Sequence, residues 1–186
     1  MNDKIQIAVL IGTVRTGRQT EFPAQYVADF LSKQADVDVV LVDPRKLQLG
    51  DEGEEIKDAN YSQITATADA FVIVTPEYNH GYPGSLKRML DSEYANYFHK
   101  PVSLVGVSSG AWGGTRACEA LLPVCHRLGL VNIRPELYFP NVTQMFDQSG
   151  ILKPEFTDQY AKNTQVMATE LLWFARTLKQ ARSQQT

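Results

Sequence analysis

The sequence contains few of the residues that staple small domains together. It has two cysteines, Cys118 and Cys125, and three histidines in 186 residues. There is no CxxC pair, and the histidines lack the spacing of metal ligands, so we expect neither a disulfide framework nor a metal site. The two cysteines are expected to be small buried side chains.

Long hydrophobic runs and an excess of one charge are absent as well. No stretch approaches the roughly 18 uncharged apolar residues of a membrane-spanning helix, and the first residues lack the pattern of a signal peptide. Lys and Arg number 18 and Asp and Glu 21, so the net charge is −3. This balance gives no drive toward nucleic acid or an anionic membrane. We expect a cytoplasmic protein without such partners.

The sequence does contain a regular alternation of apolar runs and helical periodicity. Its length suits one domain with a sizeable core, and we expect a single domain over residues 1–186. Continuous apolar runs, in which both faces of a strand would be apolar, predict buried strands at 4–11, 36–42, 70–75, 101–107 and 131–133. Helical spacing follows at 22–34, 61–68, 83–94, 114–128 and 157–181, and the stretch 138–154 is expected to be irregular.

This alternation predicts an α/β fold with a flavodoxin-like five-stranded parallel sheet. The expected strand order is 2-1-3-4-5, with helices on both faces. In such sheets ligands bind beyond the carboxyl ends of the strands. The loops after the first, third and fourth strands are therefore the candidate site.

The loop after the first strand, residues 12–20, reads GTVRTGRQT and suits an anion. It precedes a helix, whose unpaired N–H groups favour phosphate, and its threonines and arginines add further donors. The GxxxxGK[ST] motif fails, because Arg18 and Gln19 replace the Lys and the Ser or Thr, and GxGxxG lacks its second glycine. We expect a phosphate site of another kind; the alternative is a solvated basic loop with capping threonines.

The loop after the third strand, residues 76–84, reads PEYNHGYPG and is the most distinctive segment. Its prolines and glycines fix an uncommon backbone path, its tyrosines offer ring surfaces, and Asn79 offers both a donor and an acceptor. Such a loop suits a planar heteroaromatic ligand; the alternative is an ordinary helix start. Glu77 and His80 suggest an acid–base pair, although a loop histidine is more often a surface residue.

The loop after the fourth strand begins with Gly-Val-Ser-Ser-Gly at 106–110, which matches the G-x-S-x-G motif of serine hydrolases. A nucleophilic Ser108 needs a histidine later in the chain. Only His126 follows it, in the next helix, and Glu119 is the only acid between them. The loop is better explained as a ligand clamp, in which glycines let the backbone approach a flat ring and Trp112 covers it.

Together the three loops resemble the NADPH-dependent FMN reductase family, which has the flavodoxin-like fold. The resemblance covers about residues 4–133 and is most specific in Pro-Glu-Tyr-Asn at 76–79, which leads into Tyr-Pro-Gly-Ser-Leu-Lys at 82–87. It implies FMN as cofactor and NADPH or NADH as co-substrate. The implied phosphate-binding residues are Thr13, Arg15, Arg18 and Thr20. The residues implied to line the flavin ring are Pro76, Glu77, Tyr78, Asn79, Ser108, Ser109, Gly110 and Gly113.

The resemblance also implies the reaction. Hydride passes from NAD(P)H to the flavin and then to a quinone, azo compound, metal oxyanion or free flavin, so no catalytic side chain is needed. A homodimer or homotetramer is implied, and the aromatic stretch Tyr94, Tyr97 and Phe98 is a candidate interface, with core packing as the alternative. Two other functions stay open: an electron carrier without turnover, and a hydrolase that uses Ser108.

Overall fold

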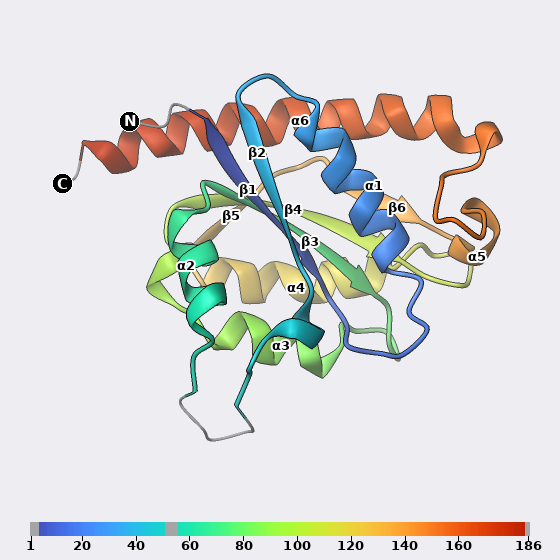
Figure 1. Cartoon of the computed structure of the whole chain (residues 1–186), viewed down its shortest axis with the longest axis horizontal. Coiled ribbons are helices and arrows are strands. Elements are labelled where there is room, and N and C mark those ends of the chain that lie inside the picture. The colour runs from blue at the N-terminus through green and yellow to red at the C-terminus, as the bar shows by residue number, and fades with distance from the viewer. Residues whose placement is uncertain (1–3, 51–55, 185–186) are drawn as a thin grey trace.

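The computed structural model describes residues 4–50 and 56–184 of the chain (Figure 1). Its centre is a parallel sheet with the strand order β2-β1-β3-β4-β5, which confirms the predicted order 2-1-3-4-5. Of the three inner strands, β3 and β4 are buried along their whole length, as expected for apolar runs covered on both faces. The strand bounds are Ile5–Ile11 for β1, Val37–Val42 for β2, Ala70–Pro76 for β3, Lys100–Val107 for β4 and Leu130–Asn132 for β5.

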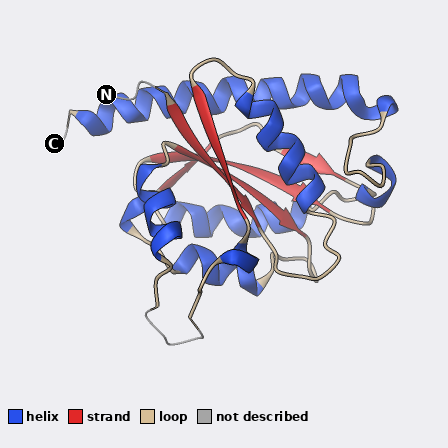
Figure 2. Cartoon of the chain, in the orientation of Figure 1, coloured by secondary structure: helices blue, strands red, loops and turns tan. Residues whose placement is uncertain are grey.

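Helices cover both faces of the sheet, as Figures 1 and 2 show. Helices α1 and α6 pack on one face, and α2, α3 and α4 pack on the other. Side chains alternate along a strand, so Ile7 and Val9 of β1 pack in the core under α1 and α6, while Ala8 and Leu10 pack in the core under α2, α3 and α4. The helix bounds are Glu21–Ser32 for α1, Ala59–Thr67 for α2, Gly84–Asp91 for α3, Thr115–Arg127 for α4, Val142–Met145 for α5 and Pro154–Ser183 for α6, with short 3-10 turns at Pro44–Lys46 and Ala95–Tyr97.

The fifth position of the sheet differs from the sequence prediction. Strand β5 pairs with the first residues of β4, and a further strand β6 (Leu137–Phe139) pairs with the last residues of β4. Between them Pro135 has no N–H to donate, and its carbonyl accepts a hydrogen bond from the Ser103 hydroxyl at 3.2 Å. The prediction that 138–154 is irregular is therefore wrong where β6 and α5 form.

The aromatic stretch that the sequence suggests as an interface is only partly at the surface. Tyr97 is fully buried, and its hydroxyl lies 2.7 Å from that of Tyr61, so this residue belongs to the core. Tyr94 and Phe98 are exposed and pack edge to face. Cys118 and Cys125 are free and buried, as predicted. None of the described helices is long and apolar enough to cross a membrane.

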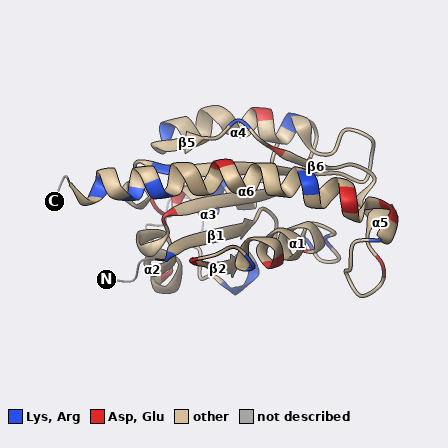
Figure 3. Ribbon diagram, turned by 90° about the horizontal axis from the view of Figure 1, so that it is seen from above, with Lys and Arg blue, Asp and Glu red and all other residues tan. Residues whose placement is uncertain are grey.

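Ion pairs tie the long last helix to the sheet. Figure 3 looks down on α6, whose C-terminal half carries several Lys and Arg residues. Lys179 and Arg182 bind the carboxylate of Asp69 at 2.8 and 2.9 Å, and Asp69 also accepts the backbone N–H of Gln6. The contact fixes α6 against the amino-terminal edge of the sheet, opposite the edge where the candidate site lies.

Candidate functional site

The three loops singled out in the sequence follow β1, β3 and β4, and we call them the first, third and fourth loops after those strands. They meet at the carboxyl ends of the strands. They enclose a pocket of about 370 Å³, which falls in the usual range for small-molecule sites. Eight of the predicted site residues line it: Arg15, Arg18, Thr20, Pro76, Glu77, Tyr78, Ser108 and Ser109. Thr13, Asn79, Gly110 and Gly113 lie in the same loops but are not among the lining residues.

The pocket also has a wall that the sequence did not indicate. Val142 and Thr143, in the first turn of α5, line it next to the fourth loop. They are brought there because Phe139 of β6 accepts the backbone N–H of Ser108, and Val142 donates its own N–H to the carbonyl of Ser108. The pairing of β6 with β4 places Val142 and Thr143 at the pocket. Strand β6 has three residues, which is too short for its pattern to be recognised in the sequence.

In the first loop, Thr13 makes hydrogen bonds inside the protein. It is buried, and its hydroxyl lies 3.1 Å from the hydroxyl of Tyr78 and accepts the backbone N–H of Arg15 at 3.2 Å. Its carbonyl accepts a hydrogen bond from Arg18 at 2.6 Å. Thr13 therefore connects the first loop to the third one.

Arg18 is the most buried cation of the site, with a side chain that is 2% exposed. It uses four N–H groups on protein acceptors: one on Thr13, one on Glu21 and two on the carboxylate of Asp43, at 2.9 and 2.8 Å. Burial alone would raise the pKa of Asp43, but hydrogen bonds from Arg18 and Arg45 outweigh it and hold this pKa well below its usual range. The fork–fork contact braces the loop against the end of β2.

Other groups of the first loop remain available to a ligand. The side chain of Arg15 is exposed at the pocket, and no acceptor binds it in the described part of the chain. Thr20 precedes α1 without capping it through its side chain, and it lines the pocket. A free guanidinium and a hydroxyl beside the start of a 12-residue helix fit a phosphate group.

The third loop turns back sharply after β3. Tyr78 and Gly81 exchange backbone hydrogen bonds of 2.8 and 3.0 Å. Between them Asn79 and His80 both have positive φ, +49° and +67°, as in type I′ hairpin turns. The tip of this turn is exposed, so His80 is a surface residue and does not pair with Glu77.

Glu77 pairs with a residue of α4 instead. Its Oε1 accepts a hydrogen bond from Nε of Arg116 at 2.6 Å and lies 2.5 Å from Nη2 in the ion pair. The side chain of Glu77 is only 8% exposed, and its Oε2 is buried without a partner. The pair joins the third loop to the first turn of α4, behind the fourth loop.

The glycines of the fourth loop serve backbone packing more than was predicted. A Cβ on Gly114 would lie 2.4 Å from the backbone N of Val107, and one on Gly113 would lie 2.9 Å from Tyr138. These two glycines let the start of α4 approach β4 and β6. At Gly110, by contrast, a Cβ would meet no atom within 4 Å.

The geometry gives Ser108 no hydrolase partners among the described residues. Its hydroxyl donates to the carbonyl of Gly110 at 2.7 Å. His126 lies in the last turn of α4, roughly 16 Å along the helix axis from the start of that helix. The hydroxyl therefore closes the loop on itself, and G-x-S-x-G here is a turn sequence.

A flavodoxin-like sheet with a pocket formed by the loops after β1, β3 and β4 is the arrangement expected of a flavin-binding protein. The comparisons with known proteins agree. The sequence profile of the NADPH-dependent FMN reductases matches residues 5–144, so the chain belongs to that family. It is a flavin-dependent NAD(P)H oxidoreductase with FMN as its cofactor.

Individual relatives carry related activities in their names. A 2-hydroxy-1,4-benzoquinone reductase of Burkholderia sp is 30% identical over 84% of this chain and 90% of its own length. An NAD(P)H-dependent FMN reductase of Schizosaccharomyces pombe is 31% identical over 82% of both chains. Among solved structures, an NAD(P)H:(acceptor) oxidoreductase of Paracoccus denitrificans is similar with a TM-score of 0.72 at 20% identity, covering 91% of this chain and 98% of its own, and this likeness supports the fold.

Proposed function

We propose that the pocket binds FMN with its phosphate at the first loop. The phosphate is held by the Arg15 guanidinium and the Thr20 hydroxyl, beside the positive end of the α1 dipole. Arg18 and Thr13 act one layer behind, because their polar groups already bind Asp43, Tyr78 and the loop backbone. The observation that carries this proposal is that Arg15 is free at the pocket, whereas Arg18, the other arginine of the lining, is bound to Asp43.

The flavin ring then lies between the third and fourth loops. Residues 76–78 line one side of this pocket, and Ser108 and Ser109 line the other. The mutual hydrogen bonds of Tyr78 and Gly81, together with the bond from Glu77 N–H to the Val107 carbonyl, make this border rigid before a ligand arrives. Asn79 at the turn tip presents an amide toward solvent, where it can meet a substrate that enters above the ring.

We propose quinones as the electron acceptor, since relatives that match most of the chain are named quinone reductases. FMN, when bound, supplies the two-electron chemistry between NAD(P)H and the acceptor. The protein positions both in turn and excludes water, and it needs no side-chain base or nucleophile. Within a single domain over residues 1–186, co-substrate and acceptor share one site above the flavin.

Steady-state oxidation of NADPH by the FMN-loaded protein, with and without a benzoquinone, tests the function. We expect turnover that depends on both FMN and the quinone. Bound flavin without any turnover would instead identify an electron carrier. A protein that stays colourless after incubation with FMN would refute the flavin site itself.

The phosphate assignment has its own test. Arg15→Ala removes the free guanidinium without touching a buried ion pair, so we expect FMN affinity to fall about 10-fold or more. Riboflavin lacks the phosphate, and its affinity should stay the same. Equal losses for the two ligands would show that the first loop holds another part of the flavin.

We further propose a homodimer or homotetramer. Tyr94 and Phe98 form an exposed aromatic pair, and the guanidinium of Arg127 lies 5.8 Å from the ring of Tyr94. Aromatic and arginine side chains of this kind are typical of interface cores. Light scattering should show an oligomer that Phe98→Asp dissociates, and a monomeric wild-type chain would contradict the proposal.

A further inference from the structure

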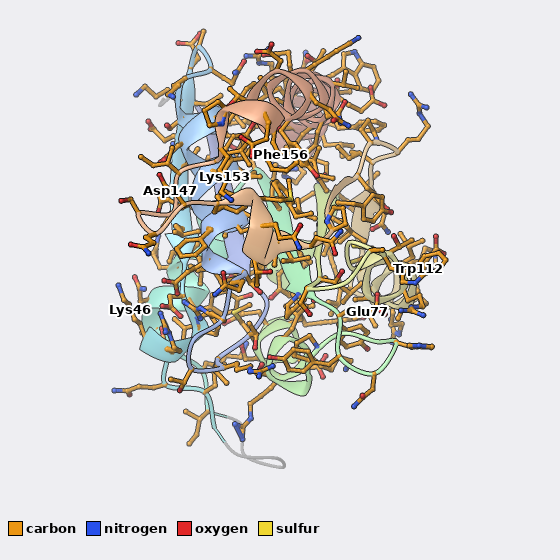
Figure 4. The ribbon with its side chains drawn as sticks, turned by 90° about the vertical axis from the view of Figure 1, so that its right-hand side faces the viewer. Lys46, Glu77, Trp112, Asp147, Lys153 and Phe156 are labelled. Atoms are coloured by element: carbon orange, nitrogen blue, oxygen red, sulfur yellow. The ribbon has the colours of Figure 1, made fainter. Side chains whose placement is uncertain are left out.

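Trp112 is the most exposed aromatic side chain among the described residues, at 66%. It stands on the fourth loop, three residues after pocket-lining Ser109. In Figure 4 it lies at the outer edge of the cluster of loops, with Glu77 closer to the middle. Two thirds of its surface is exposed, so much of the indole is open to a ligand beside the flavin pocket.

Arg116 lies next to this ring, with its guanidinium carbon 5.5 Å from the centre of the indole. Nε and Nη2 contact the buried carboxylate of Glu77, while Nη1 has no acceptor among the described residues. The side chain is 39% exposed. Glu77 thus holds the guanidinium in one orientation and leaves its Nη1 edge facing outward.

The charge at this place favours an anion. Arg116 stands in the first turn of α4, at the positive end of the helix dipole. Glu77 balances one unit of charge but approaches from the buried side. An aromatic face next to a fixed guanidinium edge matches a nucleotide, whose base stacks and whose phosphate binds bidentately or end-on.

We propose that Trp112 and Arg116 form the subsite for the adenosine part of NAD(P)H. The indole stacks on the adenine, the Nη1 edge of Arg116 binds a phosphate, and Glu77 is the positioning residue for Arg116. This inference rests on the proposed function, because it concerns the co-substrate of that reaction. The phosphate is either the 2′-phosphate, present only in NADPH, or the diphosphate that both dinucleotides carry.

Calorimetric titration of the FMN-loaded protein with two fragments tests the subsite. Adenosine 2′,5′-bisphosphate carries the 2′-phosphate, and adenosine 5′-diphosphate carries the diphosphate. Trp112→Ala removes an exposed ring, so the variant should fold, and we expect it to weaken both fragments about 10-fold. Arg116→Lys retains a cation for Glu77 but loses the Nη1 edge.

The second variant identifies the phosphate. If Arg116 binds the 2′-phosphate, Arg116→Lys weakens only the bisphosphate; if it binds the diphosphate, the variant weakens the 5′-diphosphate. The matched control is Trp173→Ala, which removes a similarly exposed indole from α6, outside the pocket lining. Fragment affinities that change in neither Trp112→Ala nor Arg116→Lys, compared with this control, would overturn the proposal.

Kinetics separate this inference from the proposed function. Trp112 does not line the pocket, so we expect Trp112→Ala to raise the KM for NADPH about 10-fold while kcat and the KM for the quinone stay unchanged. Weaker FMN binding in this variant would instead support the cover over the flat ring that the sequence predicts, and it would overturn the subsite. A raised KM for the quinone alone would overturn the subsite, because the ring would then contact the acceptor. A wild-type protein that oxidises neither NADPH nor NADH would refute the proposed function, whatever the fragments show.

Discussion

Replacing Arg18 by methionine should destabilise the protein much more than replacing Arg15. The two arginines stand in the same loop and are chemically equal in the sequence, but Arg18 is 2% exposed and makes four hydrogen bonds. Arg15 is exposed. Arg18→Met retains much of the buried chain length, so the change mainly removes the guanidinium.

The magnitude follows from the partners left behind. Removing one member of a buried ion pair costs about 3–5 kcal/mol, because the other charge stays buried. Asp43 still binds Arg45, whose Nη2 lies 2.8 Å away, which places the loss at the low end of that range. The Thr13 carbonyl loses its donor as well, which adds about 1 kcal/mol. We therefore expect Arg18→Met to lower the free energy of unfolding by about 4 kcal/mol.

Urea denaturation of four proteins measures this: wild type, Arg18→Met, Asp43→Leu and the double variant. The double variant removes both charges, so it should be less destabilised than the sum of the single variants, with a coupling of about 2 kcal/mol or more. A loss below 1 kcal/mol for Arg18→Met, or additive single variants, would refute the buried pair.

Flavin titration of the same variant shows whether Arg18 also touches the phosphate. If Arg18 braces the loop, Arg18→Met weakens FMN and riboflavin by similar factors, whereas Arg15→Ala weakens FMN alone. A selective loss of FMN in Arg18→Met, with stability retained, would support the direct phosphate contact that the sequence predicted.

Three further predictions concern stability. Gly114→Ala should cost at least about 2 kcal/mol, because φ is +85° and the new Cβ would overlap the backbone of β4, while Gly110→Ala in open space should cost almost nothing; equal melting temperatures would contradict this. His80→Gly should raise the free energy of unfolding by up to about 1 kcal/mol, since glycine relieves the left-handed φ, and a loss would refute the strain. Burial lowers the pKa of Lys100 to about 8, so the unfolded chain binds its proton more tightly between pH 8 and 10.5. Stability should therefore gain up to about 3 kcal/mol from this group as pH rises through that window, and Lys100→Met should lack the rise in urea denaturation.

Much of the fold follows from local patterns. Apolar runs such as 70–75 and 101–107 are buried on both sides of the sheet, so their composition alone indicates inner parallel strands. The three ligand loops were recognisable because glycine, proline and charged residues gather after those runs, and the structure brings the loops to one pocket. The divided fifth position escaped prediction, since β5 and β6 each have three residues and depend on β4 for their pairing.

The sequence by itself determined the class of the protein and predicted the edge of the sheet where a ligand would bind, because the burial of strands and the chemistry of turns depend on neighbouring residues. Only the tertiary structure decided which polar groups of that site are free. Arg18 meets Asp43 across 25 positions and Glu77 meets Arg116 across 39, so neither pair has a signature in the sequence. A buried charge is costly unless it is paired, so Arg18 and one edge of Arg116 are bound to carboxylates. Arg15 and the outer edge of Arg116 have no such partner among the described residues, so a ligand can reach them.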